Sequence, residues 1–380
     1  MQPSLYALSD VALAAIPSPA LVVFAPLLER NLAAMLQIAG ATDRLRPHCK
    51  THKTREIIRL LLDRGVTRHK TATVREAAMC LEAGARDVVL AYQLVGPLLD
   101  QFAMLAAQYP DARLSALVDN ERSAYQLSAA ATAHGVTIGA LVDLDTGLHR
   151  TGLPVGDAAA ALYRRAAELP GLRPAGLHVY DAQNRTPDPT ERCRAVRATI
   201  EPVLALAAKL ERGGLPVPEI LCGGSGTFPC YAELARSAAA AITFSPGTTV
   251  FWDHGYAQTL PDLNAHFTPA ALLLSRVVSR TTPQHVTLDL GNKAIASDPP
   301  LGRRGLILGL EDAVTVLHNE EHWTVTSEHA GALQVGDPVL VIPTHICPNA
   351  NLYPLIYVVD ETGALVARWE VAARQRGLIL

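Results

Sequence analysis

The stretch Leu45-Arg46-Pro47-His48-Cys49-Lys50-Thr51-His52-Lys53 starts as a short strand-like run and ends in a cluster of basic side chains. Seven more short apolar runs follow it at the spacing of repeated β-α units, with helix-forming segments such as 76–81 and 200–211 between them. These runs cover residues 69–72, 88–91, 114–118, 140–144, 176–180, 220–222 and 241–244. Alternating strands and helices predict a parallel sheet, and eight strands close a (β/α)8 barrel.

The pattern of predicted secondary structure changes after about residue 261. Segments rich in β-formers, at 277–279, 286–289, 323–325 and 338–342, are joined by short turns without long helices, which predicts a β-rich domain over 261–380. A helix over 26–39 separates the apolar run 20–24 from the first barrel run, so we expect residues 1–25 to join the β-rich domain. The predicted barrel then covers 26–260, and 380 residues accommodate a ~250-residue barrel with a second domain.

Composition and charge exclude several classes of protein. The chain is 49% hydrophobic and 18% charged, and its net charge of -3 is spread without blocks of like charge. These values argue against extensive disorder, a nucleic-acid partner and a polybasic membrane surface. No apolar stretch reaches the ~18 residues of a membrane span, and the N-terminus lacks the basic start of a signal peptide. Six cysteines are too few for a disulfide framework, so we expect a cytoplasmic protein with reduced cysteines.

Lys50 is the first candidate for chemistry, because functional groups of a barrel gather at the C-terminal ends of its strands. Its amine can attack a carbonyl, and the basic residues flanking it in the sequence are expected to favour the free amine. A solvated basic loop would show the same cluster, which by itself does not separate the two interpretations.

Two loops rich in glycine and hydroxyl residues follow the seventh and eighth predicted strands, where barrels often bind phosphate. Their glycines let backbone N–H groups approach a phosphate, and their hydroxyls add donors. The expected cofactor-binding residues are Gly223, Gly224, Ser225, Gly226 and Thr227 in the first loop and Ser245, Gly247 and Thr248 in the second. A phosphate site combined with a reactive lysine indicates pyridoxal 5'-phosphate.

Ordered motifs along nearly the whole chain resemble the D-threonine aldolase and D-serine dehydratase family. They lie at residues 46–53, 73–77, 95–97, 145–152, 176–180, 223–227, 245–247, 289–294, 320–322 and 343–348. The resemblance implies the alanine-racemase-like fold of pyridoxal-phosphate enzymes, called fold type III, which is a (β/α)8 TIM barrel plus a C-terminal β-rich domain. It also implies a homodimer with shared sites.

Roles are expected for four residues, and the resemblance implies those of Lys50, Arg150 and Tyr180. Lys50 is expected to bind the cofactor covalently, and Arg150 to lie beside the ring oxygen, where a planar guanidinium is well suited. Tyr180 is expected to face the cofactor ring, and His52 to carry protons near it. A surface arginine and a structural buried tyrosine remain the alternative interpretations of Arg150 and Tyr180.

His345 and Cys347 are the candidate metal ligands. In an extended segment, residues two apart point to the same face, so imidazole and thiolate could bind one divalent ion. The pattern is weak on its own, since most such pairs are structural. The resemblance implies a catalytic metal at this segment; the thiolate favours zinc, and manganese remains an alternative.

The implied function is a pyridoxal-phosphate- and metal-dependent lyase acting on a small-molecule D-β-hydroxy amino acid. Segments 245–249 and 251–256 favour an aldolase that converts D-threonine to glycine and acetaldehyde, whereas Cys347 favours a dehydratase of D-serine or 3-hydroxyaspartate. An amino-acid racemase and a non-catalytic pyridoxal-phosphate-binding protein are further alternatives; the second β-rich domain argues against the latter. Where many relatives carry Gly-His after the tyrosine, this chain has Asp181-Ala182-Gln183-Asn184, so we expect different substrate contacts there.

Overall fold

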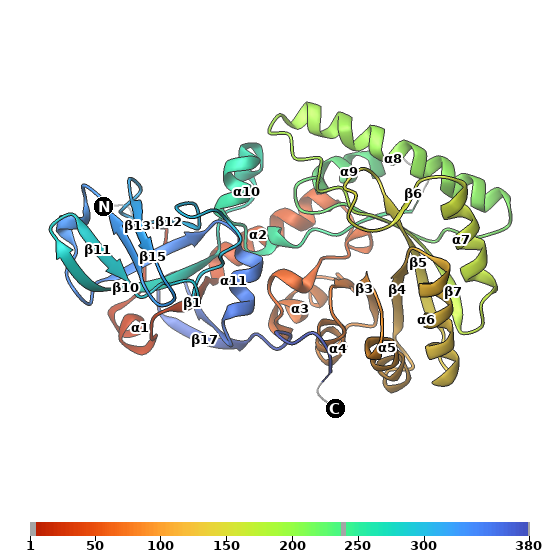
Figure 1. Cartoon of the computed structure of the whole chain (residues 1–380), viewed down its shortest axis with the longest axis horizontal. Helices are drawn as coiled ribbons and strands as arrows, with labels where there is room; N and C mark the ends of the chain where they lie inside the picture. Colours follow the sequence, from red (N-terminus) through yellow and green to blue (C-terminus); the bar gives the residue numbers. More distant parts are fainter. Residues whose placement is uncertain (1–4, 237–240, 379–380) are drawn as a thin grey trace. The chain divides into compact units, whose positions relative to one another are not determined.

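The computed structural model describes residues 5–236 and 241–378, which form two compact units (Figure 1). Among these residues, the barrel unit contains 36–50, 55–236, 241–247 and 375–378, and the β-rich unit contains 5–35, 51–54 and 248–374. The chain therefore passes from the barrel unit to the β-rich unit directly after Lys50 and again directly after Gly247.

The barrel unit is built on a curved parallel sheet with the strand order β2-β3-β4-β5-β7-β8-β9, and β6 pairs with β5. The bounds are β2 (Arg68–Thr71), β3 (Asp87–Gln93), β4 (Arg113–Val118), β5 (Ile138–Asp145), β6 (Leu153–Pro154), β7 (Leu172–Val179), β8 (Ile220–Cys222) and β9 (Ile242–Phe244). Each of the seven main strands overlaps one of the predicted runs. The alternation of short apolar runs with helices therefore predicted these strands correctly.

The first predicted run, 45–48, differs from the other seven because it forms no continuous ladder. Leu45 makes a single parallel bridge to Phe244 of β9, and His48 makes one to Lys70 of β2. The N–H of Lys70 donates to the Pro47 carbonyl at 3.0 Å. Pro47 has no N–H of its own, which removes one ladder bond from this segment. The segment nevertheless connects the two ends of the sheet and so closes the ring.

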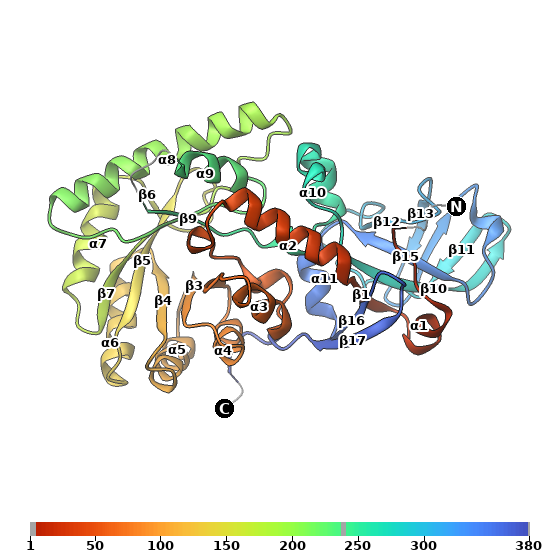
Figure 2. The ribbon, with the colours of Figure 1, turned by 180° about the vertical axis from the view of Figure 1, so that it is seen from behind.

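Helices connect the strands of the barrel unit, and Figures 1 and 2 show α5, α6 and α7 on the outer side of the sheet. The bounds are α3 (Arg55–Leu62), α4 (Val74–Glu82), α5 (Pro97–Gln108), α6 (Glu121–Ala133), α7 (Asp157–Glu168), α8 (Pro189–Arg212) and α9 (Phe228–Ala235); α2 (Ala25–Ala39) crosses between the units. Helix α8 begins earlier than the 200–211 segment suggested. Asp188 caps it by accepting a hydrogen bond from the Glu191 N–H at 2.8 Å, and Pro189 suits the first turn.

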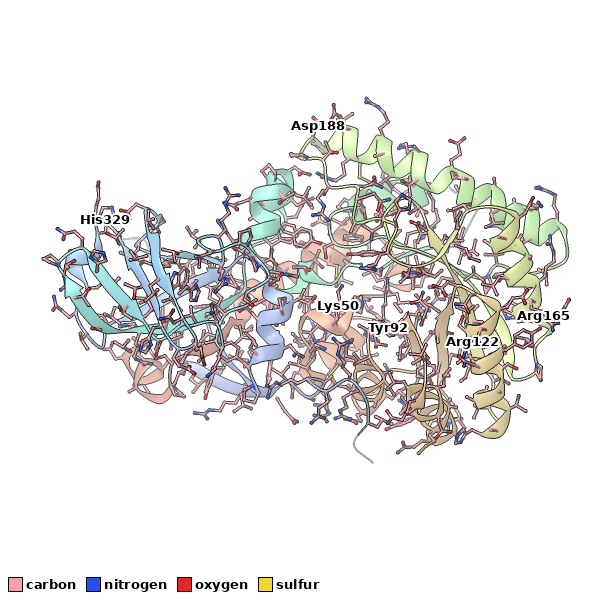
Figure 3. All side chains as sticks on the ribbon, viewed as in Figure 1. Lys50, Tyr92, Arg122, Arg165, Asp188 and His329 are labelled. Carbon is pink, nitrogen blue, oxygen red and sulfur yellow. A yellow bond between two sulfur atoms is a disulfide. The ribbon has the colours of Figure 1, made fainter. Side chains whose placement is uncertain are left out.

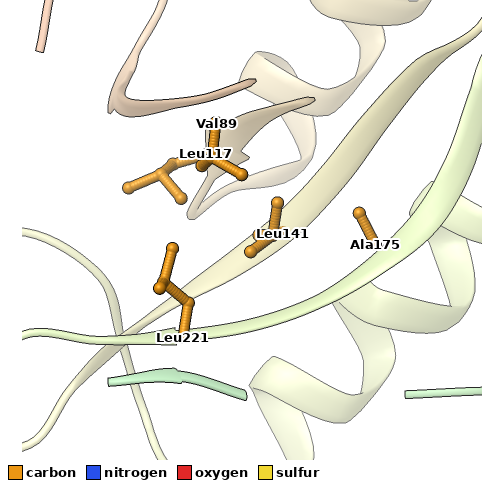
Figure 4. Close-up of a cluster of buried hydrophobic side chains, with 5 residues drawn as sticks. All are labelled: Val89, Leu117, Leu141, Ala175 and Leu221. Carbon is orange, nitrogen blue, oxygen red and sulfur yellow. The ribbon is translucent and has the colours of Figure 1, made fainter. Parts of the chain in front are cut away.

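An apolar cluster fills the inside of the sheet (Figure 4). One side chain comes from each of five strands, namely Val89, Leu117, Leu141, Ala175 and Leu221. All five are at most 6% exposed. The interior is thus a packed core, and room for a ligand is left towards the strand ends.

The β-rich unit contains a nine-stranded mixed sheet with the main order β13-β14-β11-β10-β1-β16-β17, joined by β15 and β12. The strands are β1 (Ala20–Phe24), β10 (Ala271–Thr282), β11 (His285–Leu288), β12 (Gly305–Ile307), β13 (Val314–His318), β14 (Trp323–Thr326), β15 (Pro338–Pro343), β16 (Leu355–Val359) and β17 (Leu365–Glu370), with helices α1 (Asp10–Ala15), α10 (His254–Thr259) and α11 (Ile346–Leu352). Strand β1, from the N-terminal segment, pairs antiparallel with β10 and parallel with β16. It therefore lies in the middle of this sheet.

One expectation about the cysteines is wrong. Cys193 of α8 and Cys230 of α9 form a disulfide, with their Cα atoms 5.1 Å apart and the two residues 37 positions apart in sequence. The spacing of cysteines along the chain gave no sign of this pair, because the packing of α8 on α9 brings them together. Cys49, Cys80, Cys222 and Cys347 form no disulfide with any described residue. Among the described residues, no helix is both long and apolar enough to cross a membrane.

Candidate functional site

A pocket of about 340 Å³ lies at the C-terminal ends of the barrel strands. Lys50 and Tyr92, both labelled in Figure 3, line it. The other lining residues are His48, Lys70, Ala72, Ala91, Gln93, Leu117, Asp143, Arg150, Thr151, His178 and Tyr180. Three of the four predicted catalytic residues, Lys50, Arg150 and Tyr180, are thus brought together in one pocket.

Three cations surround the ring of Tyr180. The Cζ atom of Arg150 lies 4.5 Å from the ring centroid, and the Nζ atoms of Lys50 and Lys70 lie at 5.9 Å and 6.0 Å. The negative face of an aromatic ring attracts each of them, but the cations repel one another. An anionic ligand would relieve this repulsion, so the pocket suits a phosphate-bearing cofactor.

Of the basic residues flanking Lys50 in sequence, His48 lines the pocket but Arg46, His52 and Lys53 do not, which corrects part of one expectation. Arg46 is buried and ion-paired with Asp87 at 2.7 Å and with Glu219 at 2.9 Å. His52 and Lys53 belong to the β-rich unit. The positive charges of the pocket therefore come mainly from Lys70 and Arg150, which are distant from Lys50 in the sequence.

The loop that carries Arg150 is shaped by Asp145 at the end of β5. One carboxylate oxygen of Asp145 accepts hydrogen bonds from the backbone N–H groups of Gly147 and His149, both at 3.0 Å. The other oxygen lies 2.7 Å from Nδ1 of His149, whose φ of 55° is in the left-handed region. These bonds determine the turn that immediately precedes Arg150.

A buried carboxylate–imidazole pair forms one side of the pocket. Oδ1 of Asp143 lies 2.7 Å from Nδ1 of His178, and Oδ2 of Asp143 accepts hydrogen bonds from Gln93 and Thr151, both at 2.8 Å. Burial opposes the charge of Asp143, but these partners keep its pKa below the usual value. Burial and the charge of Lys70 lower the pKa of His178, so its ring stays neutral.

The remaining ring nitrogen of His178 has no hydrogen-bond partner among the described residues. This Nε2 atom is buried and belongs to a residue that lines the pocket. A buried polar atom without a partner is costly, and its usual explanation is a missing ligand or water. The pocket therefore fits a bound group that offers a hydrogen-bonding atom to His178.

The two loops predicted to bind phosphate are linked to each other. The backbone N–H of Gly247 donates to the Ser225 hydroxyl at 3.1 Å, and the Ser245 hydroxyl donates to the Gly223 carbonyl at 2.8 Å. Gly223 has φ of 69°, and a side chain at Gly224 would come within 3.3 Å of the Tyr180 ring. The glycines thus allow a tight loop next to that ring, as a close approach of backbone to a ligand requires.

Thr227 ends the first of these loops, and its hydroxyl is used inside the protein. It donates to Oδ1 of Asp181 at 2.8 Å, while the Tyr231 hydroxyl donates to Oδ2 of Asp181 at 2.9 Å. Burial raises the pKa of Asp181 despite these hydrogen bonds. The segment that departs from the family pattern after Tyr180 therefore supports the base of this loop through Asp181.

His52 and Thr248, two further predicted site residues, lie in the β-rich unit rather than in the barrel pocket. His52 is buried, and its Nδ1 accepts a hydrogen bond from the Thr54 N–H at 3.2 Å. Thr248 Oγ1 lies 3.6 Å from Sγ of Cys347. Both residues thus contribute to the structure around the segments where the chain changes unit.

The candidate metal ligands are adjacent in space, although not in the extended segment that we expected. His345 occupies the N-cap position of α11 and Cys347 lies in the first turn of that helix, where the two side chains are close enough to interact electrostatically. Nδ1 of His345 lies 2.5 Å from Oδ2 of Asp298, and the Thr51 hydroxyl lies 3.2 Å from Sγ of Cys347. Imidazole and thiolate are suitable donors for zinc. No group of three or more His, Cys, Asp or Glu side chains that could hold a metal occurs among the described residues, so other ligands would complete the coordination.

Several pocket residues were missed by the sequence analysis, chiefly Lys70, Asp143 and His178. Each lies in a run that was correctly predicted as a barrel strand. A polar residue inside an apolar strand is a usable signal, because it is seldom buried there without a partner or a function. Gln93 and Thr151 gave no comparable signal, since both lie at strand or loop ends where polar residues are common.

Comparison with known proteins identifies the family. A family model described as "Alanine racemase, N-terminal domain" matches residues 26–251, and one described as "Putative serine dehydratase domain" matches residues 270–359. The chain is 31% identical to a D-threonine aldolase of Arthrobacter sp over 95% of this chain and 94% of the relative. It is 24% identical to a D-threo-3-hydroxyaspartate dehydratase of Delftia sp. (strain HT23) over 93% of this chain and 96% of the relative.

A solved structure supports the same relationship. The D-threonine aldolase from Filomicrobium marinum has a TM-score of 0.86 to this chain at 29% identity, covering 95% of this chain and 96% of the other. The predicted fold class and family are therefore confirmed. The chain belongs to the D-threonine aldolase and D-serine dehydratase family, whose barrel is that of the alanine racemases.

Proposed function

We propose that the protein is a lyase for D-β-hydroxy amino acids that depends on pyridoxal 5'-phosphate and a divalent metal ion. The favoured reaction is the cleavage of D-threonine to glycine and acetaldehyde. The observation that carries the proposal is the convergence of Lys50, Arg150 and Tyr180 on one pocket next to two glycine-rich loops. The 31% identity to a D-threonine aldolase supports the same choice of substrate class.

Different residues of the barrel pocket would bind different parts of the cofactor. The Lys50 amine is the nucleophile that would hold the cofactor carbonyl and release it to the substrate amine. Backbone N–H groups of the 223–227 loop and the hydroxyl of Ser225 would hold the phosphate. The Ser245 hydroxyl already donates to the Gly223 carbonyl, so it would support the loop from within. Arg150 and Tyr180 would position the ring by stacking and charge.

Two groups of the protein can move or hold protons in this pocket. The Lys50 amine would be available as a base for a substrate bound in the pocket. Neutral His178 has Nε2 available while Asp143 holds Nδ1, which is the usual arrangement for orienting an imidazole. Pyridoxal phosphate when bound supplies an electron sink, and a divalent ion held by His345 and Cys347 supplies a Lewis acid.

The aldolase proposal is tested by incubating the purified protein, loaded with pyridoxal phosphate and either zinc or manganese, with D-threonine. We expect equal amounts of glycine and acetaldehyde, and loss of both products after treatment with a chelator. L-Threonine is the matched control and should not react. Turnover of D-threonine without glycine would contradict the aldolase assignment.

A dehydratase is the second candidate, and the pairing of a thiolate with His345 is the observation that favours it. A D-threo-3-hydroxyaspartate dehydratase is among the relatives, and a variant of that enzyme with a cysteine replaced by alanine is described as metal-free. The dehydratase would produce a 2-oxo acid and ammonia from D-serine or 3-hydroxyaspartate. Ammonia release from these substrates, measured beside glycine release from D-threonine, separates the two reactions.

A further inference from the structure

Lys70 is a buried amine in the cofactor pocket that the proposed chemistry does not yet use. Its residue is 3% exposed, and its Nζ donates to the Ser245 hydroxyl at 3.0 Å. That hydroxyl in turn donates to the Gly223 carbonyl. The Lys70 amine is thus held next to Ser245, whose hydroxyl links the two glycine-rich loops, and Lys70 also lines the pocket.

The surroundings of Lys70 make a positive charge costly in the ligand-free protein. Burial, together with the charges of Lys50 and Arg150 and against an opposing contribution from Asp143, lowers the pKa of Lys70 to about 7. Lys70 forms no ion pair with any described residue. A lysine that only stabilised the fold would be expected to have a carboxylate partner, because an unpaired buried charge destabilises a protein.

The position of Lys70 explains why a lysine is present despite this cost. An electron-rich group entering the pocket would supply the missing partner and share the Lys70 hydrogens with Ser245. Pyridoxal phosphate offers such groups in its phosphate, its ring oxygen and its ring nitrogen. We propose that Lys70 contacts the bound cofactor and acts as a second cofactor-binding lysine, one that holds it by hydrogen bonding and charge rather than covalently.

This inference rests on the proposed dependence on pyridoxal phosphate, and the two can fail separately. If the wild-type protein does not bind pyridoxal phosphate, the proposed function is wrong. If the wild type binds it and removal of the Lys70 amine changes nothing, only the role of Lys70 is wrong.

The test compares Lys70→Met, which keeps the length of the side chain but removes its charge, with Lys209→Met. Lys209 lies on α8 and pairs with exposed Asp157, so it is a control for loss of a lysine outside the pocket. The readouts are the dissociation constants of pyridoxal phosphate and of pyridoxal, from absorbance titration of the apoprotein, and the urea midpoint of the apoprotein.

We expect Lys70→Met to weaken pyridoxal phosphate binding by ~10-fold or more, as for loss of a hydrogen bond to a charged group, with an unchanged or higher urea midpoint. Lys209→Met should bind as the wild type does. A loss confined to pyridoxal phosphate places the contact at the phosphate, whereas an equal loss for pyridoxal places it at the ring.

Binding within twofold of wild type, or a urea midpoint of the apoprotein clearly below that of wild type, would overturn the proposal, the latter because it would make Lys70 structural. If Lys70→Met does not fold, Lys70→Gln retains a hydrogen-bond donor without the charge. It should then bind pyridoxal phosphate more weakly than wild type at an unchanged urea midpoint, and wild-type affinity in this variant would likewise overturn the proposal.

Discussion

Asp143 and His178 form a buried pair in the barrel pocket, with Oδ1 of the carboxylate 2.7 Å from Nδ1 of the imidazole. They come from β5 and β7, which are neighbours in the sheet. Because the carboxylate accepts the Nδ1 hydrogen, Nε2 of His178 is left as an acceptor in the pocket. This relationship makes His178 a candidate for contact with the bound cofactor or substrate.

Replacing Asp143 with asparagine should disturb the orientation of His178. An amide can present its N–H₂ group to Nδ1 and so force the hydrogen to Nε2, the wrong tautomer for an acceptor. We expect turnover of the amino acid substrate to fall by ~10²-fold, which is within the range for a misplaced acid–base group. Thr151→Val removes one donor to Asp143 and keeps the carboxylate, so its effect should be much smaller. Equal effects of the two variants would contradict this role for Asp143.

Lys50→Ala should remove the absorbance band near ~420 nm that a lysine-bound cofactor produces, together with activity. The reason is that Lys50 is expected to supply the covalent bond. Lys293→Ala is the control, since Lys293 is exposed and paired with Glu320 and Glu321 in the β-rich unit. Absorbance spectra of the reconstituted proteins provide the measurement. Persistence of the band in Lys50→Ala would show that another amine binds the cofactor.

Asp298→Asn should weaken metal binding by ~10- to 100-fold, as is usual when the partner of a ligating histidine is lost. Asp298 holds Nδ1 of His345, which leaves Nε2 for the ion. Competition with a chromophoric chelator measures the zinc affinity directly, without reference to turnover. His345→Ala and Cys347→Ala should lose tight binding altogether. Asp312 is an exposed aspartate of the same unit that accepts a hydrogen bond from the Ser327 hydroxyl, and Asp312→Asn should bind zinc as the wild type does.

Acidification should destabilise the fold through buried histidines. Burial, helped by the charge of Arg46, lowers the pKa of His69 to about 3 from an ordinary 6.5. Between these pH values the unfolded chain binds the proton and the folded chain does not. The contribution of His69 to the free energy of unfolding is therefore complete above pH 6.5. It decreases by ~1 kcal/mol per pH unit as the pH falls from 6.5 towards about 3.

Urea unfolding of the apoprotein at a series of pH values measures this slope. In His69→Gln the slope between pH 6 and 4 should be shallower than in wild type, whatever the change in absolute stability. His178, whose pKa is also lowered by burial, should keep part of the slope in that variant. An unchanged slope would mean that His69 is not the group responsible.

The disulfide between Cys193 and Cys230 predicts a thiol count. The chain has six cysteines, of which two are paired, so four thiols should react in denaturant without a reductant and six after reduction. Titration with a thiol reagent measures both numbers. Six reactive thiols before reduction, in protein purified without reductant, would show that the pair is not oxidised. Cys193→Ser with Cys230→Ser should show four thiols under both conditions.

Much of the architecture could be predicted from the sequence because the barrel repeats a local pattern. Short apolar runs alternate with helix-forming segments, and both periodicities can be recognised from residues that are close together in the sequence. The segment 45–48 was the exception, since Pro47 interrupts its ladder. The disulfide could not be predicted, because it depends on how α8 packs on α9.

The same distinction between local and long-range features applies to the candidate site. The sequence by itself determined the barrel class, the position of Lys50 directly after the first barrel segment, the two glycine-rich loops and the His345–Cys347 pair, since each is a short motif with its own chemistry. Only the tertiary structure decided that Lys70, Asp143 and His178 share the pocket with Lys50, and that Arg46 does not contribute its charge there. The physical reason is that burial and neighbours across strands set these charges and partners, and neither is encoded in adjacent residues.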